Sequence, residues 1–298
     1  MKSTEICKLC TGTFVIAFAF AASSEALAAK PIQRDDLRAP EIVEIQNDKN
    51  VYRVGDRVWS LYYITKDGVV VIDPCGKRIA ERMAQLIKEK TNLPVKYVIY
   101  SHNHWDHIAG AKVFKDQGAT IIAHELAAKN IREGNPDVVA PDWIWTGDKK
   151  TLSIGGQDIE MTYFGYKSHG EGNVVIKLKE TNGVYTADSF VPDRMLFQYV
   201  ADGISHRYLR YQQDMMKMDF SKIYTVHVRT LATREDLQNS INFITDLRNE
   251  TKRVLKSGVS GFDAPYKVQL PQWSHLLMYK EWLPLNVMKV VQEETLGY

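Results

Sequence analysis

The most informative stretch of the sequence is a short run rich in histidine and aspartate, YSHNHWDH at residues 100–107. His102 and His104 are two positions apart, so in an extended segment both side chains point to the same side, as two ligands of one metal must. Asp106 and His107 follow, and they can face a second ion. Imidazole and carboxylate are ligands that zinc accepts, and a catalytic zinc keeps one position open for water. The run therefore predicts a metal centre.

Single histidine and aspartate residues elsewhere extend this run to a pattern that resembles the metallo-β-lactamase superfamily. The hallmarks of that superfamily are an acidic residue after an early strand, H-x-H-x-D-H, a later lone histidine, a later aspartate or cysteine, and a final histidine. Each hallmark has a counterpart here, in the same order, within about residues 45–230: Asp73 after VVVI, the run from His102 to His107, His169 in SHGEGN, Asp188 in YTADS and His227 after IYTV.

The resemblance implies a fold, a ligand set and two zinc ions per chain. The fold would be α/β, a four-layer αββα sandwich of two mixed sheets flanked by helices. The ligands of the first zinc would be His102, His104 and His169; those of the second would be Asp106, His107 and His227, with Asp188 bridging. Asp73 would orient the histidine run through hydrogen bonds without touching metal. Iron or manganese also suit such ligands.

The same resemblance implies a hydrolase. Zinc lowers the pKa of bound water to about 7, so a metal-bridging hydroxide could attack an ester, lactone, thioester or amide carbonyl at neutral pH. Asp106 would be the catalytic residue that orients this nucleophile and passes its proton to the leaving group. An aspartate at position 188 is more like hydroxyacylglutathione and lactone hydrolases than the best-known β-lactamases, which tend to have cysteine or serine there.

Three other functions stay open at this point. One is β-lactam hydrolysis, and a second is an iron-dependent oxidoreductase on the same scaffold. A third is a metal-binding protein without catalysis, which the complete ligand set disfavours. The sequence also departs from the superfamily at its last histidine, which usually sits in a Gly-His-Gly-like turn. Here Val226 and Val228 flank His227, so this loop must differ.

Hydrophobic periodicity predicts the elements that position these residues. Strands are expected at 69–72, 95–100, 120–123, 158–164, 173–178 and 184–187. Helices are expected at 77–91, 109–116, 124–133, 234–256 and about 273–293. The short break at Gly155-Gly156 is too short for a domain hinge, so residues 29–298 are expected to form one domain.

The first 28 residues have the pattern of a secretory signal peptide: weak positive charge, an apolar run (TGTFVIAFAFAA) and a small-x-small ending near Ala28. The apolar run is shorter than the roughly 20 residues that span a bilayer. We therefore expect a periplasmic or secreted protein with no stable membrane anchor after cleavage. The net charge of +2 gives no support to nucleic-acid binding, so the expected partner is a small-molecule substrate. The oligomeric state is not predictable from the sequence.

Several other reactive residue types have a plainer interpretation. Cys75 would be the only cysteine left after cleavage, and without a neighbouring basic group it is expected to be inert. His124, His206 and His275 are expected to be structural or surface residues. Lys167 and Arg194, like Tyr166, flank the expected ligands and could anchor a substrate anion, although long side chains of this kind are usually just solvated.

Overall fold

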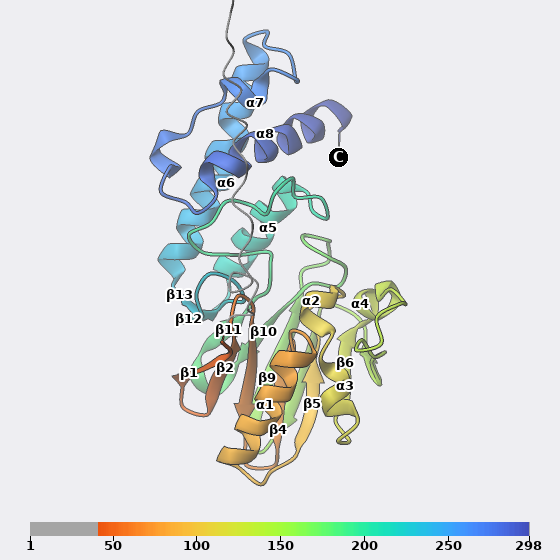
Figure 1. Ribbon diagram of the computed structural model, residues 1–298. Helices are drawn as coiled ribbons and strands as arrows, with labels where there is room; N and C mark the ends of the chain where they lie inside the picture. Colours follow the sequence, from red (N-terminus) through yellow and green to blue (C-terminus); the bar gives the residue numbers. More distant parts are fainter. Residues whose placement is uncertain (1–40, 298) are drawn as a thin grey trace, which may run out of the picture. The chain divides into compact units, whose positions relative to one another are not determined.

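The computed structural model describes residues 41–297, so the predicted signal peptide lies outside the described residues. This part of the chain contains two β-sheets (Figure 1). The first sheet has seven strands in chain order: β1 (Val43–Asp48), β2 (Val51–Gly55), β3 (Trp59–Ile64), β4 (Val69–Ile72), β5 (Val95–Ile99), β6 (Thr120–His124) and β7 (Trp143–Trp145). Strands β1 to β4 pair antiparallel, and β4 to β7 pair parallel.

The second sheet has six strands in the order β13-β12-β11-β10-β9-β8. Their bounds are β8 (Lys149–Ile154), β9 (Gln157–Tyr163), β10 (Val174–Leu178), β11 (Gly183–Tyr185), β12 (Lys222–Tyr224) and β13 (Leu231–Ala232). Neighbouring strands are antiparallel except for β11 and β12, which are parallel. Both sheets are therefore mixed.

Strand β4 shows why the apolar runs fold as buried strands. Val70 and Ile72 belong to the apolar layer between the two sheets, which also receives Ile176 and Tyr185 from the second sheet. The alternate residues of β4 point the opposite way and pack in a separate core with helix α1 (Lys77–Lys90). A strand covered on both faces needs apolar side chains at every position. This explains the uninterrupted β-branched sequence VVVI.

Helices cover the outer face of each sheet. On the first sheet α1 and α3 (Ala111–Lys115) pack in one core with β4 and β5. On the second sheet α5 (Ser205–Met216) and α6 (Arg234–Lys256) pack against β10 and β11 through Tyr211, Met215, Leu237 and Ile241. The order helix, sheet, sheet, helix confirms the expected αββα fold.

The remaining helices are α2 (Trp105–Ile108), α4 (Glu125–Asn130), α7 (Ala264–Lys267) and α8 (Tyr279–Leu296). Helices α6, α7 and α8 share an apolar core with residues 195–200 and Tyr208 of α5, and this core includes Phe243, Leu247, Val287 and Val290. Between residues 41 and 297, no helix has both the length and the apolar character that a membrane span requires.

The structure differs from the predicted elements in several places. The helix expected at about 273–293 begins only at Tyr279, because Pro271–Trp273 forms a 3-10 turn and Met278 has a left-handed backbone, with φ of 64°. Helix α5 was not expected, because its polar sequence SHRYLRYQQDMM buries tyrosine, serine and glutamine together with methionine. Strands β7 and β8 were also missed.

Candidate metal centre

Loops that follow the central strands carry most of the predicted site residues. Asp73 comes directly after β4, and the histidine run comes directly after the neighbouring parallel strand β5. In the second sheet, Asp188 follows β11 and His227 follows its parallel neighbour β12. Because parallel strands end at the same edge of a sheet, each pair of loops is brought together by its strands. His169 is placed by the loop between β9 and β10.

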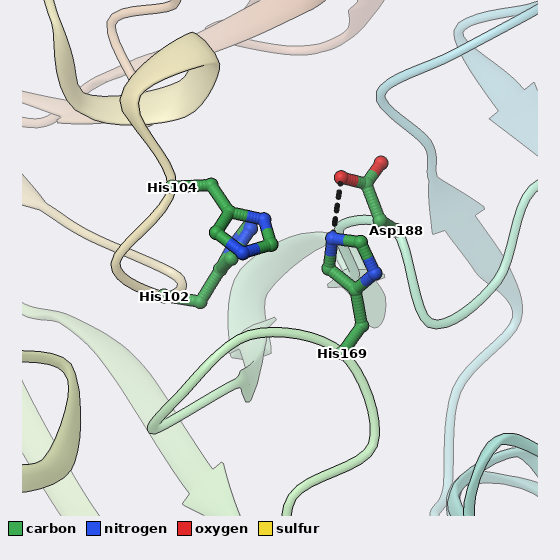
Figure 2. A group of neighbouring side chains, drawn as sticks. All are labelled: His102, His104, His169 and Asp188. Atoms are coloured by element: carbon green, nitrogen blue, oxygen red, sulfur yellow. Dashed lines mark ion pairs between the residues drawn. The ribbon is translucent and has the colours of Figure 1, made fainter. Parts of the chain in front are cut away.

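The structure brings the seven predicted ligands together in two groups. The first group contains His102, His104, His169 and Asp188 (Figure 2), and the second contains Asp106, His107, Asp188 and His227. Within each group one nitrogen or oxygen atom per residue lies within 4.8 Å of all the others. Asp188 belongs to both groups, which is the arrangement expected of a bridging carboxylate.

In the first group, each histidine has one ring nitrogen held by a neighbouring side chain. The Ser101 Oγ lies 2.8 Å from Nδ1 of His102, and the Tyr208 hydroxyl lies 2.5 Å from Nδ1 of His169. The other nitrogen of both rings, Nε2, is buried. Nε2 of His102 has no hydrogen-bond partner within residues 41–297, whereas Nε2 of His169 forms an ion pair with Asp188 at 3.1 Å (Figure 2). Buried nitrogen atoms normally have a partner. The unpartnered Nε2 of His102, which lies in one ligand group with the Asp188 carboxylate, therefore fits a bound cation.

His104 is held at Nε2, whereas His102 and His169 are held at Nδ1. Its Nε2 lies 2.5 Å from Oδ2 of Asp202, which leaves Nδ1 for a metal. The same Asp202 carboxylate accepts a hydrogen bond from the backbone N–H of Gly170 and forms an ion pair with Lys167 at 3.2 Å. Fixing one ring nitrogen sets the tautomer and orientation of a metal ligand.

In the second group, Asp188 is the common contact. Its Oδ2 lies 3.0 Å from Nε2 of His107 and 3.1 Å from Nε2 of His169, and its Oδ1 lies 2.8 Å from Nε2 of His227. Asp106 reaches to 3.5 Å of His107 Nε2, and its own side chain is 60% exposed. Asp106 is therefore the more exposed carboxylate of this group, since the side chain of Asp188 is 11% exposed.

Asp73 lies next to the histidine run, and one of its carboxylate oxygens lies within 4.8 Å of a ring nitrogen of both His102 and His107. Its carboxylate is fully buried and accepts hydrogen bonds from the backbone N–H and the hydroxyl of Ser101, at 2.8 and 2.6 Å. It also accepts one from Tyr185, and Nδ1 of His107 lies 3.1 Å away. Asp73 therefore holds the start of the histidine run in place through Ser101. Its contact with Nδ1 also fixes the tautomer of His107.

Burial and the charges of neighbouring residues shift the pKa values of these groups. Burial, together with the neighbouring histidines, keeps the pKa of His102 well below its usual value, so this ring stays neutral and able to bind metal. Burial alone would raise the pKa of Asp188, but His107, His169 and His227 outweigh it and lower that pKa well below its usual value. Asp188 is therefore ionised at neutral pH, as a bridging ligand must be.

A glycine next to His169 lets the two ligand loops approach each other. Gly170 has φ of 63°, and a Cβ atom there would lie 2.6 Å from Cδ2 of His102. No side chain fits at that distance, and the left-handed backbone itself favours glycine. Glycine at this position therefore allows His102 and His169 to share one site.

The sequence did not predict the side chains that hold the ligand rings. Ser101, Asp202 and Tyr208 each bond to a ring nitrogen of a predicted ligand. Asp202 lies 98 positions from His104 along the chain, and Tyr208 lies on the unexpected helix α5, so no local pattern could have found either of them. His124 caps helix α4 and bonds to Gly147, which is the structural role that was expected of it.

The metal-site residues form one wall of a pocket of about 260 Å³. The five that reach it are His104, Asp106, His169, Asp188 and His227. The pocket is also lined by Arg194, Phe197, Val200, Ala201, Asp202 and Tyr208. A wider groove, of about 660 Å³, adjoins this pocket at His104, Asp106, Ala201 and Asp202. A small molecule can therefore reach both groups of ligands.

Comparison with known proteins agrees with this geometry. The chain is 28% identical over 191 residues to the 2,4-dinitroanisole O-demethylase subunit alpha of Nocardioides sp. (strain JS1661), a match that covers 62% of this chain and 57% of the relative. Other curated relatives are likewise matched over only about half of their length.

Solved structures share the fold. A metallo-beta-lactamase from Pontibacter korlensis superposes with a TM-score of 0.59 at 22% identity, covering 69% of this chain and 99% of that one. A stereoselective inverting sec-alkylsulfatase from Pseudomonas sp. superposes with a TM-score of 0.69 at 15% identity, covering 86% of this chain and 50% of that one. The family model described as the metallo-beta-lactamase superfamily matches residues 53–245. The chain therefore belongs to the metallo-beta-lactamase superfamily.

Proposed function

We propose that this chain is a zinc-dependent hydrolase that cleaves an ester, lactone, thioester or amide bond of a small molecule. The observation that carries the proposal is the pair of ligand groups that share Asp188 and open onto one pocket. Two zinc ions bound there would polarise a carbonyl group and lower the pKa of water to about 7. The superfamily relationship supports hydrolysis as the class of reaction.

The ligand rings are prepared for this role by the residues around them. Ser101, Tyr208 and Asp202 each fix one histidine ring, so the free ring nitrogens converge without rearrangement. Preorganised polar groups of this kind need not reorient during the reaction.

Asp106 is the proposed proton carrier. It lines the pocket, its side chain is largely exposed, and it lies within 3.5 Å of His107 Nε2. A carboxylate in this place can orient an attacking water molecule and pass a proton to the leaving group. Asp188 is held by three histidines and is not free to do so.

The proposal is tested by a spectrophotometric panel of substrates on zinc-loaded protein, with and without a chelator. The panel contains an ester, a lactone, a thioester, an amide and a β-lactam, and it adds 2,4-dinitroanisole because of the name of the relative described above. Turnover of at least one compound that stops with chelator and returns with zinc is the expected result. Turnover that is unaffected by metal removal would overturn the proposal, and a protein that purifies with iron would favour an iron-dependent oxidoreductase.

The place of action is a separate proposal. The order of charge, apolar residues and small residues in residues 1–28 supports export to the periplasm or the medium. Amino-terminal sequencing of the protein from cell fractions tests this, since a mature chain that begins near residue 29 is expected. An intact chain recovered from the cytoplasm would contradict it.

A further inference from the structure

The turn that carries His227 has a strained backbone. Val228, directly after His227, has φ of 69°, in the left-handed region that glycine favours and a β-branched residue rarely adopts. Val228 is 44% exposed, so burial of its methyl groups does not account for this conformation. Strain of this kind persists only where surrounding contacts fix the backbone, and it is concentrated at functional sites. Contacts outside Val228 must therefore hold the turn.

A buried arginine of the first sheet reaches both sides of this turn. Arg53 lies in β2, and its side chain is fully buried. Its Nη1 donates a hydrogen bond to the carbonyl oxygen of Thr230 at 3.2 Å, and its Nη2 donates one to the carbonyl oxygen of Thr225. The two carbonyls belong to the first and last residues of the His227 turn, residues 225–230. One guanidinium therefore spans the base of this turn.

The same guanidinium is fixed in its own sheet. Its Nε donates a hydrogen bond to the carbonyl oxygen of Ser60 at 2.9 Å, and its Nη2 donates one to that of Trp59 at 2.6 Å. A planar guanidinium presents its donors in a rigid fork, which the single ammonium group of lysine does not reproduce. Arg53 therefore joins β3 of the first sheet to the His227 turn of the second with one fixed geometry.

Packing alone does not explain an arginine at this position. The four hydrogen bonds of Arg53 within residues 41–297 all go to backbone carbonyls, and none goes to a carboxylate. Burial lowers the pKa of Arg53 to about 10, which leaves the group charged at neutral pH. A buried charge without a paired carboxylate costs free energy that an apolar side chain of similar volume avoids. The geometry of the four hydrogen bonds is what the arginine adds.

Backbone contacts at the start of β3 also lead to His227. The N–H of Trp59 donates a hydrogen bond to the carbonyl oxygen of Val226 at 2.9 Å, and Val58 pairs with His227 in an isolated antiparallel bridge. The ring of His227 in turn lies with Nε2 2.8 Å from Oδ1 of Asp188. A shift of the turn relative to β3 would therefore move this ring out of the second ligand group.

We propose that Arg53 is a positioning residue for the second metal site, because it holds the strained His227 turn so that the ring of His227 faces Asp188. Valines flank His227 where a glycine would adopt a left-handed backbone without strain, so this turn depends on contacts from the other sheet. The inference rests on the proposed function for its purpose, although it is measured through zinc affinity and needs no turnover.

The test measures the zinc affinities of full-length variants by competition with a chromophoric zinc chelator. Arg53→Lys keeps the positive charge but cannot donate to all four carbonyls. Val228→Gly removes the strain, and a third chain carries both changes. Arg234→Lys is the matched control, because Arg234 also donates to two backbone carbonyls, those of Met216 and Met218, and does not line the pocket. All affinities are measured below the lowest thermal unfolding midpoint of the set, so that each chain is folded.

We expect the wild-type chain to bind two zinc ions. Arg53→Lys should weaken one of the two affinities about 10–100-fold, the usual effect of losing a group that orients a metal ligand, and leave the other unchanged. Adding Val228→Gly should restore part of the lost affinity, since glycine adopts the left-handed backbone without strain. Arg234→Lys should bind both zinc ions as the wild type does.

The His227→Ala background shows whether the effect passes through His227. Only the first site is complete in that background, and Arg53→Lys should leave its zinc affinity unchanged. An equal loss of affinity at both sites, or a loss that persists in His227→Ala, would overturn the inference, because it would indicate a general loosening of the fold. Two wild-type affinities in Arg53→Lys, or no recovery with Val228→Gly, would overturn it as well.

Failure of the proposed hydrolysis is a separate outcome. It would show as absent turnover in the substrate panel, with the dependence of zinc affinity on Arg53 preserved.

Discussion

Asp202 Oδ2 lies 2.5 Å from Nε2 of His104, which makes this loop carboxylate the orienting partner of a predicted metal ligand. Asp202→Asn should weaken the affinity of the first metal site by about 10–100-fold, because the histidine loses a partner that fixes its tautomer and raises its basicity. Competition with a chromophoric zinc chelator measures this affinity. Asp214→Asn is the control, since Asp214 bonds to Tyr166 and Lys217 and does not line the pocket. Equal losses in both variants would contradict the assigned role.

Asp106→Asn tests the proposed proton carrier while leaving the ligands of the first metal site unchanged. We expect turnover of the compound found in the substrate panel to fall by about 10²–10⁴-fold, the usual contribution of a general acid or base. Zinc at the first site should stay bound, because Asp106 belongs only to the second group. Metal analysis and kinetics on the same preparation check both points. Asp116→Asn changes an exposed carboxylate outside the site and should have no effect on turnover. Unchanged turnover in Asp106→Asn would show that another group carries the proton.

Gly170→Ala tests the close approach of the two ligand loops. The new methyl group would overlap His102, so the zinc affinity of the first site should drop while the chain stays folded. Gly156→Ala is the matched control, because Gly156 has a similar left-handed backbone, with φ of 75°, and open space around it. Both variants are expected to lose about 1 kcal/mol of stability from backbone strain, and only Gly170→Ala should lose metal. Full zinc affinity in Gly170→Ala would show that the loops can move apart freely.

Asp236 provides a prediction on pH and stability. Burial raises its pKa, but hydrogen bonds from Arg229 and Thr233 outweigh this and lower it. A carboxyl group with a lowered pKa in the folded state stabilises the fold above its unfolded pKa of about 3.9, and this contribution is lost as the pH falls through the folded value. Asp236→Asn should therefore cost about 1 kcal/mol at neutral pH, because Asp236 completes the capping box of α6 with Thr233.

The difference between wild type and Asp236→Asn should shrink as the pH falls below the unfolded pKa of about 3.9 towards the lowered folded-state pKa, because the aspartate then becomes protonated as well. Urea unfolding at neutral pH and at a series of acid pH values measures it. Glu235→Gln, one residue earlier in the same helical turn, is the control and should change stability little. A penalty for Asp236→Asn that is as large in acid as at neutral pH would show that its charge is not the cause.

The sequence predicted the parts of this fold whose residues follow a strict local pattern. Val69–Ile72 is apolar at each position because it is covered on both faces, and helix α6 has both an apolar face and a capping box at Thr233. These features are local, so both elements were placed at their observed bounds. Helix α5 lacked such a pattern, since Tyr208 and Gln212 are buried by contacts with distant loops.

The same distinction applies to the site. The H-x-H-x-D-H run and the single residues that follow strands could be identified along the chain, and the structure brings all seven together. The residues that orient them could not, because Asp202 and Tyr208 become neighbours of His104 and His169 only through tertiary structure. The same holds for Arg53, because its hydrogen bonds join β3 to the distant turn around His227.

The zinc content of the purified chain tests the central claim most directly. Wild-type protein and His227→Ala are loaded with zinc, dialysed and analysed by mass spectrometry for bound metal. The two groups of ligands predict two zinc ions per chain in the wild type and one in His227→Ala, because His227 belongs only to the second group. A wild-type chain that holds no zinc after loading, or a His227→Ala chain that still holds two, would contradict the account.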